Sequence, residues 1–114
     1  MIINSSIMKK ISLLLLLMVL ATNVYSQKTN EERASKITNE ISEVLSLNQE
    51  ETAKVYKIQL KRFYEVNTIR STYAQDPETK KSELKKVYNR LYGKLKSTLG
   101  EDKMQEWKIY KRNK

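Results

Sequence analysis

The sequence predicts an all-α fold, in which a signal peptide is followed by three to four helices built on a long antiparallel helical hairpin. The chain has only two glycines and one proline in 114 residues, so it contains few residues that break helices. Beyond residue 27, apolar side chains recur three and four residues apart, and the alternation typical of strands is missing. No Ser/Gly-rich linker divides this part of the chain, so we expect residues 27–114 to form a single helical domain.

The first 26 residues have the three regions of a cleavable secretory signal peptide in the required order. A basic region ends in Lys9 and Lys10, an apolar region follows, and a polar region ends in Ser26. The apolar region is about half as long as the ~20 residues that span a bilayer. We therefore expect cleavage after Ser26 and export across the inner membrane to the periplasm. Translation can begin at Met1 or at Met8, because Met8 and the two lysines already make a compact basic region.

The first helix is expected to run from about Asn30 to Leu45. Thr29 and Glu32 have the spacing of a capping box, in which side chains satisfy the free N–H groups at a helix start. The side chains expected to be buried recur at helical spacing and are Ala34, Ile37, Ile41, Val44 and Leu45.

A second helix is expected from Asn48 to Tyr73 or Ala74. Asn48 can cap this helix, and Glu50 and Glu51 favour the positive end of its dipole. Its candidate buried stripe consists of Val55, Ile58, Arg62 or Phe63, Val66, Ile69 and Tyr73.

Asp76, Pro77 and Glu78 mark the start of a third helix, which we expect to end near Thr98. Asp is a capping residue, Pro suits the first helical position, and Glu suits the first turn. A heptad-like seam on this helix favours lengthwise packing against the second helix in an αα-hairpin. The seam comprises Leu84, Tyr88, Leu91, Leu95 and Thr98.

The last helix is expected to be short and to follow a glycine. Gly100 can end the third helix in a left-handed conformation. The last helix then runs from Glu101 to Lys111, with Met104, Trp107 and Tyr110 on one face.

The composition excludes most enzyme chemistry. The chain has no Cys and no His, which removes thiol nucleophiles, imidazole acid–base catalysis and zinc sites of the ordinary type. The acidic pairs all stand at expected helix starts, where carboxylates favour the helix dipole. These pairs are Glu31 with Glu32, Glu50 with Glu51, and Glu101 with Asp102. We therefore expect no catalytic residue, no cofactor and no metal, and a protein that is not an enzyme.

The positive charge is concentrated in the C-terminal third of the chain. Without the two signal lysines, 20 basic and 13 acidic residues give the mature chain a net charge of +7. From Lys80 onward, 12 basic and 4 acidic residues are interleaved with aromatic side chains. This pattern would indicate nucleic-acid binding in a cytosolic protein, but export argues against that partner. A solvated helix face, or a face that attracts acidic protein segments or an anionic membrane surface, is expected instead.

Two segments of the chain look alike when they are aligned on their leucines. Residues 45–55 and 95–105 each contain a Leu at the end of a helix, a capping residue and an acidic first turn. They resemble the paired L-T-x-x-Q motifs of the Spy/CpxP family of periplasmic proteins. The motif-like positions are Leu47, Asn48 and Glu51 in the first segment and Leu99, Gly100 and Lys103 in the second.

The resemblance implies a protein that acts by binding. Spy/CpxP proteins are small all-helical chains that form cradle-shaped antiparallel dimers. They bind unfolded clients without ATP or restrain a sensor kinase of the envelope stress response. An elongated homodimer is also favoured physically, because a monomer of this length buries few apolar side chains against the entropy lost on folding.

We accordingly expect a chaperone-like protein whose partners are unfolded or partly folded proteins. Basic side chains would attract such clients and aromatic ones would make adaptable contacts. Chosen by residue type, the candidate client-binding residues are Tyr56, Arg62, Phe63, Tyr64, Arg70, Lys85, Arg90 and Tyr92. The alternatives are a structural or regulatory protein that binds one specific envelope partner, and a basic protein that binds the membrane surface.

Overall fold

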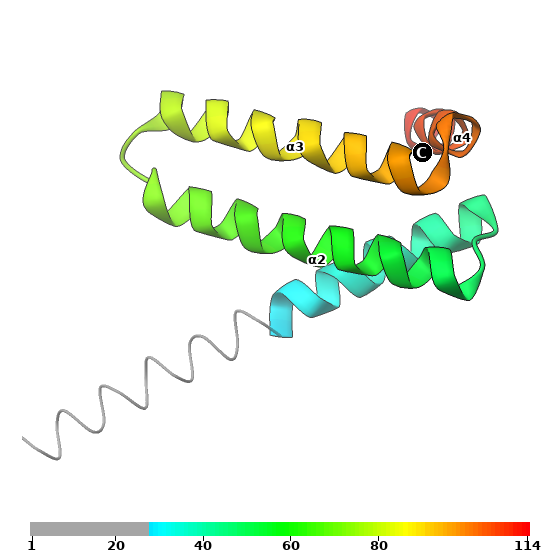
Figure 1. Ribbon diagram of the computed structural model, residues 1–114. Coiled ribbons are helices and arrows are strands. Elements are labelled where there is room, and N and C mark those ends of the chain that lie inside the picture. The colour runs from blue at the N-terminus through cyan, green and yellow to red at the C-terminus, as the bar shows by residue number, and fades with distance from the viewer. Residues whose placement is uncertain (1–27) are drawn as a thin grey trace, which may run out of the picture.

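The computed structural model describes residues 28–114, so the expected signal peptide lies outside the described residues. An N-terminal helix covers residues 28–45, followed by α2 (Gln49–Thr72), α3 (Pro77–Leu99) and α4 (Glu101–Arg112) (Figure 1). The predicted all-α class is confirmed, because no strand occurs in this part of the chain. None of the described helices has the length and apolar character needed to cross a membrane.

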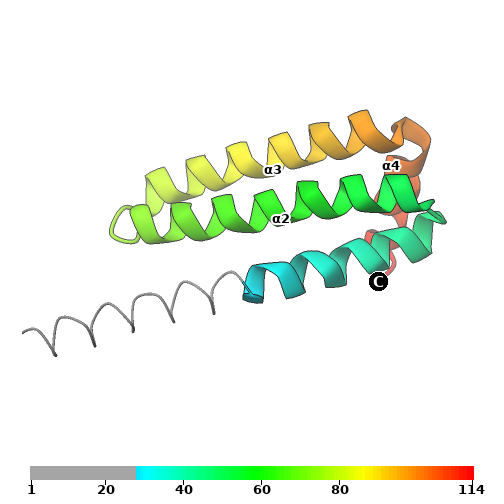
Figure 2. The ribbon, with the colours of Figure 1, turned by 60° about the horizontal axis from the view of Figure 1, so that its bottom comes forward.

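The helices are arranged around α2, which lies between the N-terminal helix and α3 (Figure 2). α2 and α3 run side by side in opposite directions, joined by the short turn before Pro77. α4 turns away from the end of α3 and brings the C-terminus to the N-terminal helix. There Lys114 Nζ lies 2.7 Å from Glu40 Oε1. All four helices therefore meet at one end of the molecule, whereas α2 and α3 alone form the other.

The hydrophobic core lies at the end where the four helices meet. Each helix contributes to it through the apolar positions that recur along its sequence, and α4 contributes the predicted face with Met104 and Trp107. The core cluster comprises Ile41, Leu45, Val55, Leu95, Leu99, Met104 and Trp107.

The N-terminal helix begins differently from the prediction. Residues 28 and 29 are already helical, so the prediction that Thr29 caps a helix starting at Asn30 is wrong. Asn30 is 2% exposed, and its Oδ1 accepts a hydrogen bond of 2.7 Å from Asn67 Nδ2 on α2. Asn30 instead takes part in a tertiary contact between the N-terminal helix and α2, which no local pattern encodes.

α2 begins as predicted, at a capping box formed by Asn48 and Glu51. The Glu51 N–H donates to Asn48 Oδ1 at 2.8 Å, and the Asn48 N–H donates to Glu51 Oε1 at 3.3 Å. Together these bonds satisfy two backbone donors that have no partner within the helix. The helix ends at Thr72, within two residues of the predicted end.

α3 also begins as predicted, with Asp76 as its cap. The Thr79 N–H donates to Asp76 Oδ1 at 3.2 Å and the Thr79 hydroxyl to Oδ2 at 2.7 Å. The predicted seam is wrong at one position, because Val87 is 2% exposed and Tyr88 is 44% exposed. Neighbouring residues lie about 100° apart around a helix, so only one of the two can face α2. The smaller Val87 takes that place, and Tyr88 lies at the edge of the contact.

The two motif-like junctions meet in space, although they lie far apart in the sequence. Lys103 Nζ, at the start of α4, is 2.8 Å from Glu51 Oε2, at the start of α2. The leucines of the two junctions lie in or against the core, since Leu99 is buried and Leu47 packs on the core cluster. The positions aligned by sequence are therefore also joined by an ion pair.

This ion pair predicts an acid-sensitive contribution to stability. The hydrogen bond from Lys103 holds the pKa of Glu51 below its ordinary value, and the Asn48 N–H lowers it further. Because the folded state favours the carboxylate, the contribution is complete above the pKa of the unfolded chain and is lost as the pH falls through the lowered pKa. Thermal unfolding followed from pH 7 to pH 2.5 should show the wild-type melting temperature falling more steeply below about pH 4 than that of Glu51→Gln.

Glu50→Gln provides the control for this titration. It removes an equal charge from the same turn, where Glu50 contacts only the exposed Lys54 at 3.3 Å in the described structure. Its melting temperature should follow the wild-type pH dependence. If Glu51→Gln and wild type lost stability in parallel with acid, the Glu51–Lys103 pair would not contribute to the acid sensitivity.

Candidate functional site

A cavity of about 220 Å³ opens where the N-terminal helix, α2, α3 and α4 converge. We call it the aromatic pocket, because two tyrosines and the single tryptophan are among its lining residues. It is lined by Ile37, Gln59, Arg62, Tyr88, Leu91, Tyr92, Leu95, Met104, Trp107 and Lys111.

The pocket has an apolar interior and an aromatic edge. Leu95 and Met104 are 4% and 3% exposed and belong to the core, so the pocket is an extension of the folded interior. Tyr88 and Tyr92 are 44% and 38% exposed. They come from successive turns of α3 and can contact a ligand with ring and hydroxyl together.

Cations surround the aromatic rings of this region. The Trp107 ring stacks on Tyr110 with centroids 5.4 Å apart, and Lys111 Nζ lies 5.6 Å from the Trp107 centroid. Lys108 Nζ lies 4.6 Å above the Tyr92 ring. Contacts of this kind fix the lysine heads near the pocket mouth without neutralising their charge.

Two polar groups in the pocket wall have no hydrogen-bond partner among the described residues. Gln59 is 2% exposed and its Oε1 is an acceptor without a donor, whereas the Nε of Arg62 is a donor without an acceptor. The Arg62 guanidinium packs 4.1 Å from the Phe63 centroid, and burial lowers the pKa of Arg62. Both atoms are buried in the wall between α2 and the pocket, where most polar groups of folded proteins have hydrogen-bond partners.

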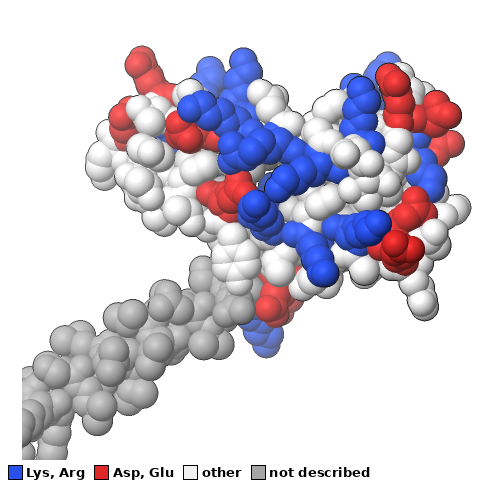
Figure 3. Space-filling model, viewed as in Figure 1, with Lys and Arg blue, Asp and Glu red and all other residues white. Residues whose placement is uncertain are grey.

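A second feature, next to the pocket, is a positively charged crevice between α2 and α3. Lys61 and Arg62 of α2 and Arg90 and Lys94 of α3 line it, and we call these four residues the basic seam. Figure 3 shows Lys and Arg side chains gathered over this face. The floor is apolar and consists of Ile58, Val87 and Leu91.

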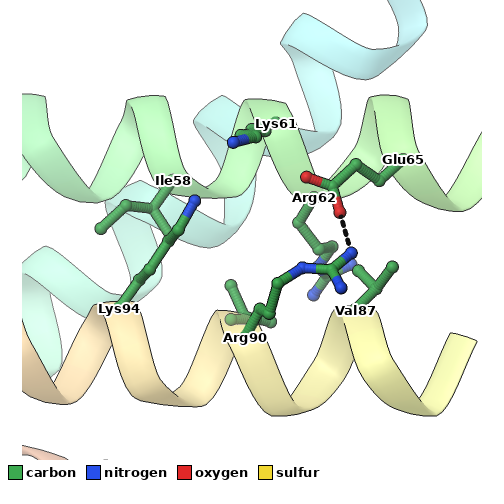
Figure 4. A pocket seen from close by; sticks show the side chains of 8 residues that line it. Ile58, Lys61, Arg62, Glu65, Val87, Arg90 and Lys94 are labelled. Atoms are coloured by element: carbon green, nitrogen blue, oxygen red, sulfur yellow. Dashed lines mark hydrogen bonds and ion pairs between the residues drawn. The ribbon is translucent and has the colours of Figure 1, made fainter.

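Two side chains of the seam, Arg90 and Lys94, extend from α3 toward α2 (Figure 4). Arg90 reaches α2 and binds Glu65, with 2.7 Å between Nη2 and Oε2. Lys94 extends toward α2 near Ile58, on the same side as Lys61. The nearby Lys61 ammonium lowers the pKa of Lys94, because a neighbouring positive charge disfavours the protonated form.

A third cavity lies between the N-terminal helix and α2. Its volume is about 520 Å³, and its lining contains no charged side chain. Within it, the hydroxyls of Ser42 and Thr52 lie 3.0 Å apart, and the buried Thr38 hydroxyl has no partner among the described residues. Tyr56 lines this cleft and does not line the aromatic pocket.

The eight predicted client-binding residues are distributed among the three cavities and the surface outside them. Arg62 and Tyr92 line the aromatic pocket, and Arg62 and Arg90 line the basic seam. Phe63 supports the Arg62 guanidinium, and Tyr56 belongs to the uncharged cleft. The remaining three are exposed and line none of these cavities: Tyr64, Arg70 and Lys85.

Sequence reasoning missed several residues that build the site. Met104 and Trp107 were predicted to share one face of the last helix but were not among the candidate client-binding residues, and Gln59 was not singled out. A signal for Gln59 exists, because it lies four residues after Val55 and seven before Val66, both buried. Because Gln59 is polar, the search for recurring apolar side chains did not identify it as buried. Nothing in the sequence distinguishes Lys61 and Lys94 from the other lysines, since they meet only through the packing of α2 on α3.

The site contains no arrangement typical of metal or nucleophilic chemistry. Between residues 28 and 114, no three or more acidic, His or Cys side chains are grouped so that they could hold a metal ion.

Comparison with family models, with curated proteins and with solved structures gave no match for this chain. The function must therefore be inferred from the geometry of the site and from the sequence.

Proposed function

We propose that this chain is an exported helical binding protein that holds exposed apolar side chains of partly folded proteins without ATP. One observation carries the proposal. An aromatic pocket with unpartnered polar groups in its wall adjoins a basic seam, and Arg62 belongs to both. The resemblance of the two helix junctions to the Spy/CpxP motifs supports a role of this kind in envelope stress.

The size of the aromatic pocket suits a side chain of a protein client. Sites for drug-sized molecules and cofactors usually enclose ~300–1,000 Å³, more than the 220 Å³ of this pocket. A single Phe, Leu or Tyr side chain fits this space. The hydroxyls of the exposed Tyr88 and Tyr92 can hydrogen-bond a peptide group that enters with it.

The chemistry of the pocket favours a varied set of clients. Met104 is flexible and polarisable, so it can adapt to side chains of different shape. Tyr88 and Tyr92 make large contacts with little loss of conformational entropy, because each has two side-chain torsions. Such surfaces bind many partners moderately well, as a chaperone requires.

The charge beside the pocket favours clients with acidic residues near the bound side chain. The four cationic residues of the basic seam and one carboxylate line the crevice, and Lys108 and Lys111 lie near the aromatic rings of the pocket. Long-range attraction of this kind raises the rate of association and depends on salt. Client capture should therefore weaken as ionic strength rises.

Export and dimerisation complete the proposal. Residues 1–26 would direct the chain to the periplasm, and two copies of the α2–α3 hairpin would form an elongated, cradle-like dimer. A dimer would add buried apolar surface to a chain whose core cluster lies at one end of the molecule. Sedimentation should detect a dimer at micromolar concentration, and a purely monomeric protein would contradict this part of the proposal.

The direct test is suppression of aggregation of reduced α-lactalbumin, measured by light scattering. At a stoichiometric ratio the wild-type protein should suppress aggregation. Tyr92→Ala should require about 5- to 30-fold more protein for equal suppression, because an aromatic contact at the centre of an interface is worth about 1–2 kcal/mol. Absence of suppression by the wild type would contradict the chaperone function.

Tyr64→Ala is the matched control for this test. Tyr64 and Tyr92 are each 38% exposed, but Tyr64 does not line the aromatic pocket. Suppression by Tyr64→Ala should equal that of the wild type. If both variants lost activity equally, exposed tyrosines in general would be responsible and the pocket would not. A pulldown that returned one stoichiometric partner and no client binding would favour the regulatory alternative.

A further inference from the structure

The basic seam has more positive charge than the single carboxylate in the lining of the crevice can neutralise. Of the eight residues that line the crevice, four are cationic and one, Glu65, is acidic. Glu65 is already bound to Arg90 at 2.7 Å. Lys61 and Lys94 consequently have no acidic side chain between them within the lining, although they lie on facing sides of the gap.

The seam brings cationic side chains of α2 and α3 together across the gap. The Lys61 ammonium lowers the pKa of Lys94, Glu65 opposes this change, and Arg90 adds to it. The two helices hold their side chains there, because Val87 is buried at the contact with Ile58 and Leu91 beside it. An anion placed between the two lysines would gain several charged donors at once.

The dimensions of the crevice indicate which part of an anion it would admit. The enclosed space is about 10 Å³, roughly the room that one water molecule needs, and it opens to the surface. One oxygen atom can enter it above the apolar floor, while the remaining atoms stay among the exposed side-chain ends. The donors of Lys61, Arg90 and Lys94 then surround the anion from both helices.

We propose that the basic seam binds a phosphate group, with one oxygen in the crevice and the others on Lys61, Arg90 and Lys94. A phosphate monoester carries up to two negative charges and three free oxygens, which match several donors from different directions. A carboxylate has one charge and two oxygens in one plane, and it would leave at least one ammonium unpaired. The phosphate can come from a soluble phosphate compound or from a lipid headgroup, which present the same chemistry. The same seam also contributes to the proposed attraction of clients, but phosphate binding does not depend on that function and is measured without a client.

The test is titration of the protein with inorganic pyrophosphate at low ionic strength, measured by calorimetry. The wild type should bind, and Lys61→Gln/Lys94→Gln should bind at least about tenfold more weakly, because two charge-assisted contacts are lost. The control is Lys57→Gln/Lys85→Gln, which removes two exposed lysines from the same two helices outside the seam. This control should lose less than about threefold, since only long-range attraction is reduced.

Two further measurements are needed. The first distinguishes a lipid headgroup from a soluble phosphate compound, and the second distinguishes phosphate binding from client binding. Co-sedimentation with phosphatidic acid vesicles, set against phosphatidylcholine vesicles, should show the same dependence on Lys61 and Lys94 if headgroups are the source. Tyr92→Ala should retain pyrophosphate binding even where it loses client suppression. The proposal is overturned if the wild type binds neither pyrophosphate nor phosphatidic acid, or if the two double variants lose affinity equally.

Discussion

Replacing Trp107 by Ala is expected to lower the free energy of unfolding by about 3–5 kcal/mol, the usual cost of removing a buried aromatic side chain. Trp107 is 4% exposed and belongs to the core cluster where all four helices meet. Its ring also stacks on Tyr110, so the substitution removes an aromatic pair as well as buried area. Small domains are stable by only about 5–15 kcal/mol, and the variant should be close to unfolded at 37 °C.

Chemical denaturation followed by circular dichroism measures this loss. Ile109→Ala is the control on the same helix, because Ile109 is 47% exposed and lies outside the core cluster. It should change the free energy of unfolding by less than about 0.5–1 kcal/mol. Equal losses in the two variants would mean that α4 does not dock through the face that contains Trp107.

The second large effect is expected at the junction between α3 and α4. Gly100 has φ 88° and ψ 166°, so the positive φ predicted from sequence is confirmed but ψ is extended instead of left-handed helical. Only glycine adopts this conformation readily. A Cβ at Gly100 would meet no atom within 4 Å, so the cost of Gly100→Ala comes from the backbone alone and should be about 1–3 kcal/mol.

Gly93→Ala should change stability in the opposite direction. Gly93 lies inside α3, and a Cβ there would also meet no atom within 4 Å. Alanine is the better helix former, so the variant should gain about 0.5–1 kcal/mol. The two substitutions are chemically identical, and denaturation curves of both therefore isolate the effect of backbone conformation. A gain or no change in Gly100→Ala would contradict the strained junction.

The core and the aromatic pocket share side chains, which affects how the site can be studied. Met104 and Trp107 belong to the core cluster and also line the pocket, so their substitution would reduce binding and folding together. Tyr92 and the lysines of the seam are exposed and can be changed with little effect on stability. Variants at these exposed positions therefore give the clearest test of binding.

Local signals in the sequence were sufficient to predict the helices of the described chain. The caps at Asn48 and Asp76 and the positive φ of Gly100 lie where the residue types indicate, because each depends on atoms within a few residues. The apolar spacing of α4 also identified its buried face. The start of the N-terminal helix was the exception, because residues 28 and 29 are already helical.

The tertiary structure decided which side chains form the site. The rotation of α2 and α3 about their axes determines three features of the site. These are the burial of Val87 instead of Tyr88, the burial of Gln59, and the approach of Lys61 to Lys94. The Glu51–Lys103 pair depends on the direction in which α4 leaves Gly100. By itself the sequence determined the all-α class, the positions of the helices and the excess of positive charge, because these follow from composition and short-range contacts. The aromatic pocket and the basic seam required the packing of helices that are distant in the chain.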